Sequence, residues 1–230
     1  MKNIVLFGYG ANGRQIAKKL KYGRRILVVD DTKAHIQKAI EDGFDNAKHI
    51  NIQSDQALAK LRLDSDYETF ICSLDDEGMN IFLVISLKDM YPSVQTVAIS
   101  DSIEMNQKLS IAGADKVIDI YESSSNRIYN IFEKPYVMKV FDILFHPNST
   151  ISFKEFTIDS GSFLVGKTID TLDFNEYGLI LIGVLDRDMA QHFTFTTHGH
   201  NHRIDTDDVL VCMGRDEDLA HFENIIKETQ

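Results

Sequence analysis

The fold is decided near the start of the chain by the stretch Ile4-Val5-Leu6-Phe7-Gly8-Tyr9-Gly10-Ala11-Asn12-Gly13. Its apolar residues have the length of a buried strand, and its glycines form the pattern GxGxxG. A helical pattern follows over residues 14–20, and a second apolar strand, residues 26–29, ends in Asp30. Strand, glycine turn, helix, strand and acid, in this order, predict a unit that binds a dinucleotide.

Each residue of the glycine turn has a physical role in this prediction. Gly8 and Gly10 let the backbone turn tightly and approach a pyrophosphate, whereas Gly13 lets the helix and the strand pack closely. The N–H groups of Ala11 and Asn12 lie at the start of the helix, where free N–H groups and the helix dipole attract phosphate. We expect these five residues to hold the phosphates of a nucleotide.

Asp30 is expected to accept hydrogen bonds from an adenosine ribose. Its charge would repel the 2′-phosphate of NADP, so the sequence argues against NADP as the ligand. The alternative is a Rossmann-like fold that has lost its ligand.

Composition limits the possible function classes. The chain has 230 residues, of which 43% are hydrophobic, and a formal net charge of −11 without a basic cluster. This argues against direct binding of nucleic acid, which needs clustered cations. Cys72 and Cys212 lie in apolar runs and are expected to be reduced core residues of a cytosolic protein. The apolar runs are shorter than the ~18 residues of a membrane helix, so any membrane role is expected to come through a partner.

Apolar strands alternate with amphipathic helices over the first half of the chain, which is typical of an α/β fold. We predict a Rossmann-like, doubly wound parallel sheet over residues 1–120. The expected strands are residues 2–7, 26–29, 49–52, 67–72, 94–99 and 116–118, and the expected helices are 14–20, 32–42, 55–63, 78–90 and 103–111.

The pattern changes after residue 120. Residues 121–147 predict two crossover helices, 122–132 and 136–145, separated at Pro135 because proline breaks the helical hydrogen-bond ladder. Their many aromatic and aliphatic residues indicate a subunit or domain interface, or else simple packing against the sheet. Residues 148–230 predict a small α+β domain with strands at 151–158, 179–185, 192–196 and 209–213 and a helix at 217–227.

Residues 161–168 match the phosphate-binding pattern GxxxxGK[ST]. We reject this nucleotide site, because such a loop must open a long helix inside a sizeable α/β domain. Only residues 169–174 could be helical here.

Three histidines, His198, His200 and His202, alternate along the chain. In an extended strand they would share one face and could hold zinc, copper or nickel. The alternative is an exposed hairpin tip rich in polar residues.

Three carboxylate groups, Asp30-Asp31, Asp75-Asp76-Glu77 and Asp207-Asp208, could hold calcium or ribose. The first two follow predicted parallel strands, where ligands usually lie, whereas solvated loop acids are the favoured interpretation of the third.

Catalytic motifs are missing. The sequence contains no Tyr-x-x-x-Lys pair, no Gly-x-Ser-x-Gly and no His-Glu-x-x-His. This absence argues against an enzyme.

The chain resembles the regulator-of-potassium-conductance family, whose members carry TrkA-N and TrkA-C domains. The resemblance in the first half rests on Phe7–Gly13, on Val29-Asp30, on the loop from Asp75 to Asn80 and on Ala112–Ile118. In the second half it rests on Gly161–Ile169, Leu172, Ile182–Val184 and Asp208–Gly214. Two departures concern the nucleotide: Ile50-Asn51 replaces the family's Gly-Asp after the third strand, and Asn12 replaces a bulkier or basic residue.

The resemblance implies a regulatory, non-enzymatic gating module of a potassium channel or potassium uptake system. Such modules are cytosolic, pair through crossover helices and assemble as dimers into an octameric ring at the inner face of the cell membrane. The implied ligands are NAD(H) or ATP/ADP, with a divalent cation as a second candidate. The predicted nucleotide site comprises Gly8, Gly10, Ala11, Asn12, Gly13, Asp30, Asp31, Asn51, Ile52, Ser73, Leu74 and Asp75. The competing hypotheses are an NAD-dependent oxidoreductase and a metal-sensing module.

Overall fold

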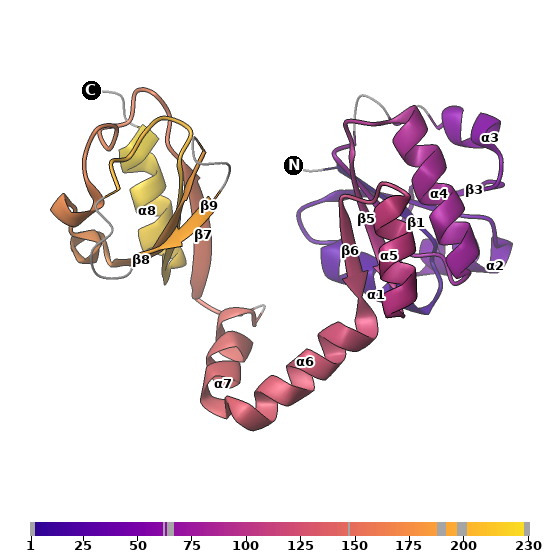
Figure 1. Cartoon of the computed structure of the whole chain (residues 1–230), viewed down its shortest axis with the longest axis horizontal. Coiled ribbons are helices and arrows are strands. Elements are labelled where there is room, and N and C mark those ends of the chain that lie inside the picture. Colours follow the sequence, from indigo (N-terminus) through magenta and orange to yellow (C-terminus); the bar gives the residue numbers. More distant parts are fainter. Residues whose placement is uncertain are drawn as a thin grey trace. The chain divides into compact units, whose positions relative to one another are not determined.

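The computed structural model describes residues 3–61, 63, 67–146, 148–187, 192–196 and 202–227. The chain divides into two compact units, Met1–Tyr129 and Asn130–Gln230 (Figure 1). Within the described residues, no helix combines the length and the apolar character needed to cross a membrane.

The first unit contains a six-stranded parallel sheet with the strand order β3-β2-β1-β4-β5-β6. The strands are β1 (Asn3–Phe7), β2 (Arg25–Asp30), β3 (Ala47–His49), β4 (Thr69–Cys72), β5 (Gln95–Ser100) and β6 (Lys116–Asp119). The helices between them are α1 (Ala11–Leu20), α2 (Lys33–Glu41), α3 (Asp55–Ala59), α4 (Glu77–Met90) and α5 (Ile103–Ile111). This topology confirms the predicted doubly wound sheet.

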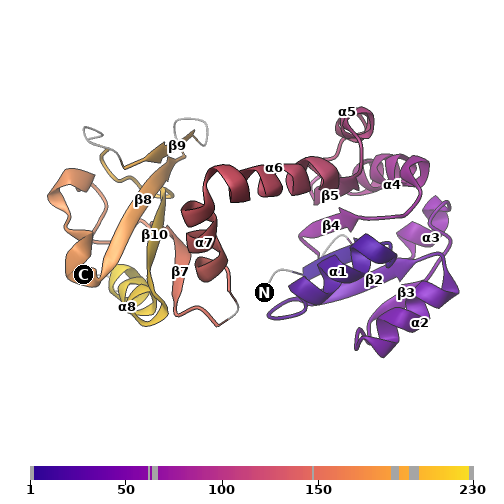
Figure 2. The same cartoon turned by 90° about the horizontal axis from the view of Figure 1, so that it is seen from below.

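Helices cover both faces of this sheet, as Figure 2 shows. On one face, α1 and α2 pack against alternate residues of β1 and β2, such as Leu6 and Val28. On the other face, the intervening residues, such as Phe7 and Val29, join side chains of α3, α4 and α5 in a larger core. The near-continuous apolar runs of the central strands follow from this burial on both faces.

The third strand differs from the prediction of residues 49–52. β3 ends at His49, and the backbone then leaves the sheet through a turn in which the Ser54 N–H donates to the Asn51 carbonyl at 3.2 Å. Ile52 is fully buried in the core beside Leu58 of α3. The apolar residues after His49 therefore fill the core and do not extend the strand. The helix predicted over residues 55–63 ends at Ala59.

One carboxylate fastens α1 to the end of α2. Asp42, which follows α2, accepts from Arg14 Nε at 2.6 Å and Arg14 Nη2 at 3.1 Å. It also accepts from the Tyr9 hydroxyl at 3.0 Å, and Lys18 Nζ lies 3.2 Å from its second oxygen. The bonds from Arg14 hold the pKa of the Asp42 carboxyl well below its usual range. Burial, followed by the bond to Asp42, raises the pKa of Tyr9. Because Tyr9 lies within the glycine turn and Arg14 directly follows it, this cluster helps to fix the orientation of the turn.

Two helices follow the first sheet. α6 (Ile120–Glu133) starts directly after β6, and Asp119 Oδ1 accepts from the Glu122 N–H at 2.8 Å. α7 (Pro135–Leu144) begins at Pro135, which can occupy a first helical position because that N–H has no partner within the helix. The predicted separation of the helices at Pro135 is confirmed.

The second unit contains an antiparallel sheet with the strand order β7-β10-β8-β9. Its strands are β7 (Ile151–Thr157), β8 (Leu179–Asp186), β9 (His192–Phe195) and β10 (Val209–Arg215). α8 (Asp216–Lys227) packs on this sheet through Leu219, Phe222 and Ile226, which confirms the predicted small α+β domain. Burial raises the pKa of the Cys212 thiol in this core to about 12.

The segment with the phosphate-loop pattern opens no long helix. It is followed by two short 3-10 helices, η1 (Ile169–Thr171) and η2 (Phe174–Tyr177). Leu164 is buried in the core, and the Gly166 N–H donates to the Ile204 carbonyl at 2.8 Å. The segment is a core-packed turn, in agreement with its rejection as a phosphate site.

We predict that Asp42→Asn lowers the melting temperature of the first unit by about 2–4 °C near neutral pH. Because the folded state depresses the pKa of Asp42, its ionised form stabilises the protein above the ordinary carboxyl pKa of about 3.9. This contribution is lost as the pH falls below that value. The difference between wild type and variant should therefore narrow from about pH 7 to about pH 3. Circular dichroism melts across this range test the prediction, and a difference independent of pH would contradict it.

Candidate nucleotide site

A pocket of about 180 Å³ lies at the carboxyl ends of β1, β2 and β4. From β1 the chain turns to α1 on one face of the sheet, whereas from β4 it turns to α4 on the other face. Ligands of open α/β sheets bind where the chain diverges in this way. The pocket is lined by Gly8, Gly10, Asp30, Asp31, Thr32, His35, Leu74, Asp75, Asp76 and Met79.

The glycine turn is as tight as the motif predicts. Gly8 has a φ of +93°, which side chains other than hydrogen rarely permit, and its N–H donates to the Val29 carbonyl at 2.8 Å. A Cβ at Gly13 would overlap the carbonyl oxygen of Gly8. Gly10 is the N-cap of α1, and because glycine has no side chain it cannot cap the first N–H groups of the helix. The backbone therefore has the form of a phosphate-binding turn.

Asp30 joins three segments around the pocket. It is only 2% exposed, and one carboxylate oxygen accepts from the Tyr9 N–H at 2.6 Å and lies 3.0 Å from His35 Nδ1. Its other oxygen accepts from the Thr32 N–H at 2.7 Å. These bonds hold the glycine turn against the start of α2. Asp30 is thus both part of the pocket wall and a structural link within the protein.

The other predicted site residues fall into two groups. Asp31, Leu74 and Asp75 line the pocket together with Gly8, Gly10 and Asp30. The structure does not bring the remaining side chains to it. Ile52 is fully buried in the core, and the Asn51 side chain accepts from the Gln53 N–H at 3.0 Å. The side chain of Ile52 is therefore not available to flank a base.

Ser73 lies beneath the turn, beside Gly8 and Gly13. It is buried, and its hydroxyl has no hydrogen-bond partner among the described residues. The next residue, Leu74, is fixed by the buried Asn80, whose Oδ1 accepts from the Leu74 N–H at 2.9 Å. An unpaired buried hydroxyl next to a phosphate-type turn is a polar group that a ligand could satisfy.

Sequence reasoning missed three residues of the lining, Thr32, His35 and Met79, and it named Asp76 only within the carboxylate group Asp75-Asp76-Glu77. His35 lies five positions after Asp30, in the first turn of α2, and only its spacing from the acid could have indicated it. Asp76 and Met79 stand at the start of α4, where Asp76 Oδ1 accepts from the Met79 N–H at 2.8 Å. Their place in the pocket depends on how α4 packs.

The pocket is acidic. Four of its lining residues are aspartates, and no lysine or arginine appears among the described residues that line it. The nearby cations Arg14 and Lys18 are paired with Asp42. The backbone fits the phosphates of a nucleotide, but the carboxylates oppose their charge.

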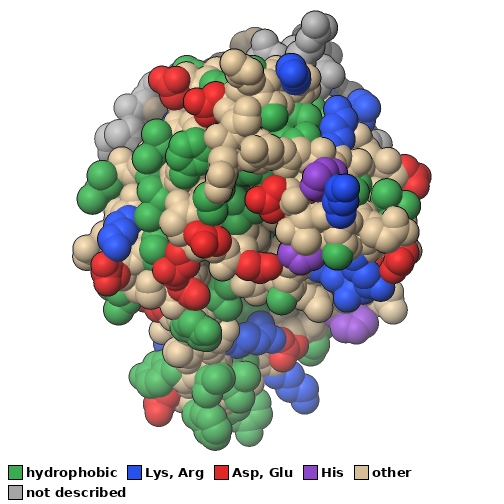
Figure 3. Space-filling view, turned by 90° about the vertical axis from the view of Figure 1, so that its right-hand side faces the viewer, with side chains coloured by type: hydrophobic (Ala, Val, Ile, Leu, Met, Phe, Trp, Pro, Cys, Tyr) green, Lys and Arg blue, Asp and Glu red, His purple; other side chains and the backbone are tan. Residues whose placement is uncertain are grey.

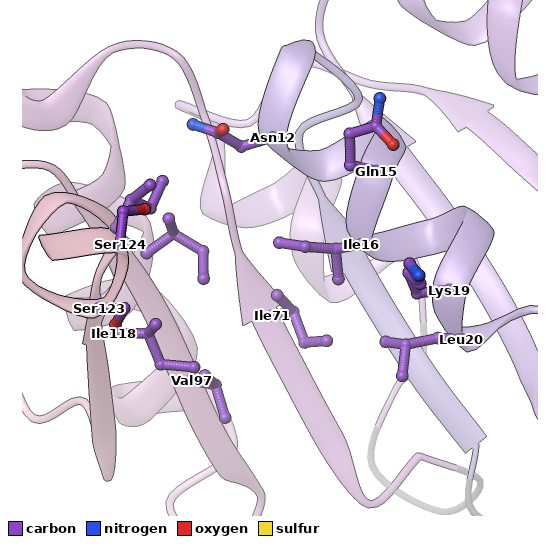
Figure 4. A pocket seen from close by; sticks show the side chains of 12 residues that line it. Asn12, Gln15, Ile16, Lys19, Leu20, Ile71, Val97, Ile118, Ser123 and Ser124 are labelled. Carbon is purple, nitrogen blue, oxygen red and sulfur yellow. The ribbon is translucent and has the colours of Figure 1, made fainter. Parts of the chain in front are cut away.

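A second, apolar pocket of about 550 Å³ lies between α1, the far half of the sheet and α6 (Figure 4). Ile16 and Leu20 approach it from α1, and Ile71, Val97 and Ile118 from β4, β5 and β6. Its wall is mostly apolar, whereas the glycine turn and the carboxylates lie at the smaller pocket.

The predicted histidine site is only partly described. His198 and His200 lie outside the described residues. His202 Nε2 lies 2.7 Å from Asp208 Oδ2, and His202 Nδ1 lies 3.7 Å from Asp186 Oδ2. Within the described ranges, no group of three or more His, Cys, Asp or Glu side chains is placed to hold a metal ion.

The fold and site define a two-part protein, with a Rossmann domain that has a phosphate-binding turn and a small α+β domain linked to it by two helices. Residues 4–120 match the TrkA-N domain model, and residues 153–227 match the TrkA-C domain model. The chain belongs to the regulator-of-potassium-conductance family, which confirms the resemblance seen in the sequence. The potassium-channel homologues of the chain carry it as a regulatory domain and not as an enzyme.

Among known proteins, the chain is 22% identical over 234 residues to "Probable potassium channel protein 2" of Methanocaldococcus jannaschii, covering 98% of this chain and 67% of that protein. The chain thus spans about two thirds of the length of this relative.

Solved structures support the fold. The GsuK RCK domain is 17% identical, with a TM-score of 0.50, over 98% of this chain and 46% of that chain. The human SLO3 gating ring has a TM-score of 0.69 at 10% identity, over 96% of this chain and 46% of that one. An NAD(P)-binding domain of an exopolyphosphatase-related protein from Archaeoglobus fulgidus, 19% identical, covers 58% of this chain and 99% of its own with a TM-score of 0.52.

We predict that Gly13→Ala lowers the free energy of unfolding by about 1–3 kcal/mol, because the added methyl group meets the Gly8 backbone. Gly78→Ala is the matched control. Gly78 lies in the first turn of α4, and the nearest atom to the Cβ that alanine would add there is Asp76 Oδ1 at 3.3 Å. Alanine favours the helix there, so the change should stay within about 1 kcal/mol of wild type. Urea unfolding followed by circular dichroism measures both, and equal losses would contradict the assigned role of Gly13.

Proposed function

We propose that the chain is a gating module of a potassium channel or potassium uptake system, controlled by an adenine nucleotide bound at the pocket of the first unit. The observation that carries this proposal is the glycine turn at the carboxyl edge of the sheet, with the free N-terminus of α1 and the carboxylate of Asp30 on either side of it. Membership of a family of potassium-channel regulatory domains provides the context.

The candidate ligands are NAD(H) and ATP or ADP. The turn offers a place for a diphosphate, which all these molecules share, and Asp30 and Asp31 stand at the end of β2, where a ribose would lie. A 2′-phosphate at this end would meet both carboxylates, so NADP is disfavoured. We propose a divalent cation as a second candidate ligand, since carboxylates suit hard cations.

Assembly is proposed to use the helices α6 and α7. Many of their large apolar side chains are exposed, and Figure 3 shows hydrophobic side chains gathered at the lower end of the view, where these helices lie. Apolar patches of this kind mark interaction sites. A second copy of the chain would cover them, and dimers would form a ring, with the octamer as the proposed state. The ring would lie at the inner face of the membrane through its channel partner.

Nucleotide control would follow from a population shift. A ligand that binds one arrangement of the paired modules more tightly than another moves the equilibrium toward that arrangement. The coupling to the pore is then limited by the difference between the two affinities. The chain therefore needs no catalytic group, in keeping with its regulatory family.

We predict that Asp30→Asn weakens binding of ADP or NAD by about 1–3 kcal/mol, because the amide cannot accept all the bonds of the carboxylate. Asp45→Asn is the control: Asp45 is exposed and lies before β3, at the opposite edge of the sheet from the pocket. Isothermal titration calorimetry on folded, nucleotide-free protein tests the prediction. An Asp30 variant that binds as tightly as wild type would refute the assignment.

The helices provide a separate prediction. Phe132 and Tyr136 are 79% and 84% exposed, so replacing both by serine should leave folding intact and convert dimers to monomers. Tyr22→Ser is the control, because Tyr22 is 89% exposed but lies outside α6 and α7. Sedimentation velocity measures the outcome. If the double variant stays dimeric, these side chains do not form the interface.

A further inference from the structure

We propose that the carboxylate of Asp75 occupies the position, beside Gly10, that the diphosphate of a nucleotide would take in the pocket. The carboxylate and the ligand then compete for this position. The proposal rests on the proposed function and concerns the regulation of that same site. It predicts that the chain binds nucleotides with a negatively charged diphosphate more weakly than the same site would bind them without the Asp75 carboxylate.

The first observation is the position of the Asp75 side chain. A Cβ added to Gly10 would overlap both of its carboxylate oxygens. The carboxylate therefore lies directly against the second glycine of the turn, in the place that glycine leaves open for a pyrophosphate. An anion at this point also lies close to the N-terminus of α1, which begins at Ala11.

The second observation is the size of the pocket. Its volume of about 180 Å³ is smaller than the roughly 300–1,000 Å³ of typical small-molecule sites. Asp75 is an exposed residue of the loop before α4, and its rotation out of the pocket would not break the N-cap of that helix, which Asp76 provides. The site can thus exist in two states, with the Asp75 carboxylate inside the pocket or rotated out of it.

The third observation is the charge around the Asp75 carboxylate. Asp30, Asp31 and Asp76 also line the pocket, without a lysine or arginine among the described lining residues. Arg14, which directly follows the glycine turn, is engaged with Asp42 at 2.6 Å. A diphosphate that enters beside Asp75 meets like charges at short distance, and no described lysine or arginine in the lining screens them.

These observations assign Asp75 a regulatory role. A nucleotide must displace its carboxylate before the phosphates reach the turn, so the affinity of the site contains the cost of that displacement. Ligands should be affected in the order of the charge they place at Gly10. ADP should be weakened most, AMP less, and adenosine hardly at all.

The experiment is a calorimetric titration of ADP, AMP and adenosine into wild type and three variants in buffer with EDTA. EDTA is present because a divalent cation could bridge Asp75 and the phosphates and so mask the repulsion. We expect Asp75→Asn and Asp75→Ala to bind ADP about five- to thirtyfold more tightly than wild type, as expected for removal of a nearby like charge. Adenosine affinity should stay within about twofold of wild type, since adenosine carries no phosphate charge.

Asp31→Asn is the charge control, and its effect is read as the ratio of ADP affinity to adenosine affinity, because a contact of Asp31 with the ribose would affect both ligands alike. Asp31 lines the same pocket but is not the side chain against Gly10. If both Asp75 variants bind ADP no more tightly than wild type, the proposal is overturned. It is also overturned if Asp31→Asn raises the affinity for ADP relative to adenosine as much as Asp75→Asn does, because the effect then comes from the total negative charge of the pocket and not from the position of Asp75. If neither wild type nor any variant binds a nucleotide, the proposed function fails together with this inference. If wild type binds ADP and the Asp75 variants bind it with the same affinity, only this inference is overturned.

Discussion

The rest of the site depends on the hydrogen bonds that the buried carboxylate of Asp30 accepts. A carboxylate that is 2% exposed is stable only if hydrogen-bond donors surround it, and here backbone N–H groups of Tyr9 and Thr32 supply them. These donors belong to the glycine turn and to the residue before α2. One charge therefore holds the end of β2, the turn after β1 and the start of α2 in a fixed arrangement, and the pocket is the space that this arrangement leaves.

Positive charge near this pocket is used for structure and not for the ligand. Arg14 and Lys18 would be natural partners for phosphates after a glycine turn, but both are paired with Asp42 and fasten α1 to α2. Among the described residues, the N–H groups and the dipole at the start of α1 are then the main features that attract an anion to the turn. A site of this kind is expected to bind weakly and reversibly, which suits a regulatory domain that responds to changes in ligand concentration.

Much of the fold could be predicted from the sequence because its signals are local. The glycine turn, the apolar strands and Pro135 each act through the backbone of their own segment, and the structure agrees with them. The position of β3 could not be predicted, because Ile52 is apolar for core packing beneath α3 and not for strand pairing. Periodicity alone does not separate these two causes of an apolar residue.

The site could be predicted only where the motif itself defines it. Gly8, Gly10 and Asp30 follow from the spacing of the turn and the acid, and all three line the pocket. His35 and Met79 reach it because α2 and α4 pack where they do, which is a tertiary effect. The contact of the Asp75 carboxylate with Gly10 joins residues 65 positions apart, and no local pattern encodes it.

The most direct test of the central claim is a nuclear magnetic resonance titration of ¹⁵N-labelled protein with ADP, in which the backbone amide signals report where the ligand binds. Binding at the glycine turn predicts the largest shifts at the amides of Gly10, Ala11 and Gly13, with smaller ones at Thr32 and Leu74. Shifts confined to the second unit, or no shift at millimolar ADP, would contradict the account and remove the nucleotide from this pocket.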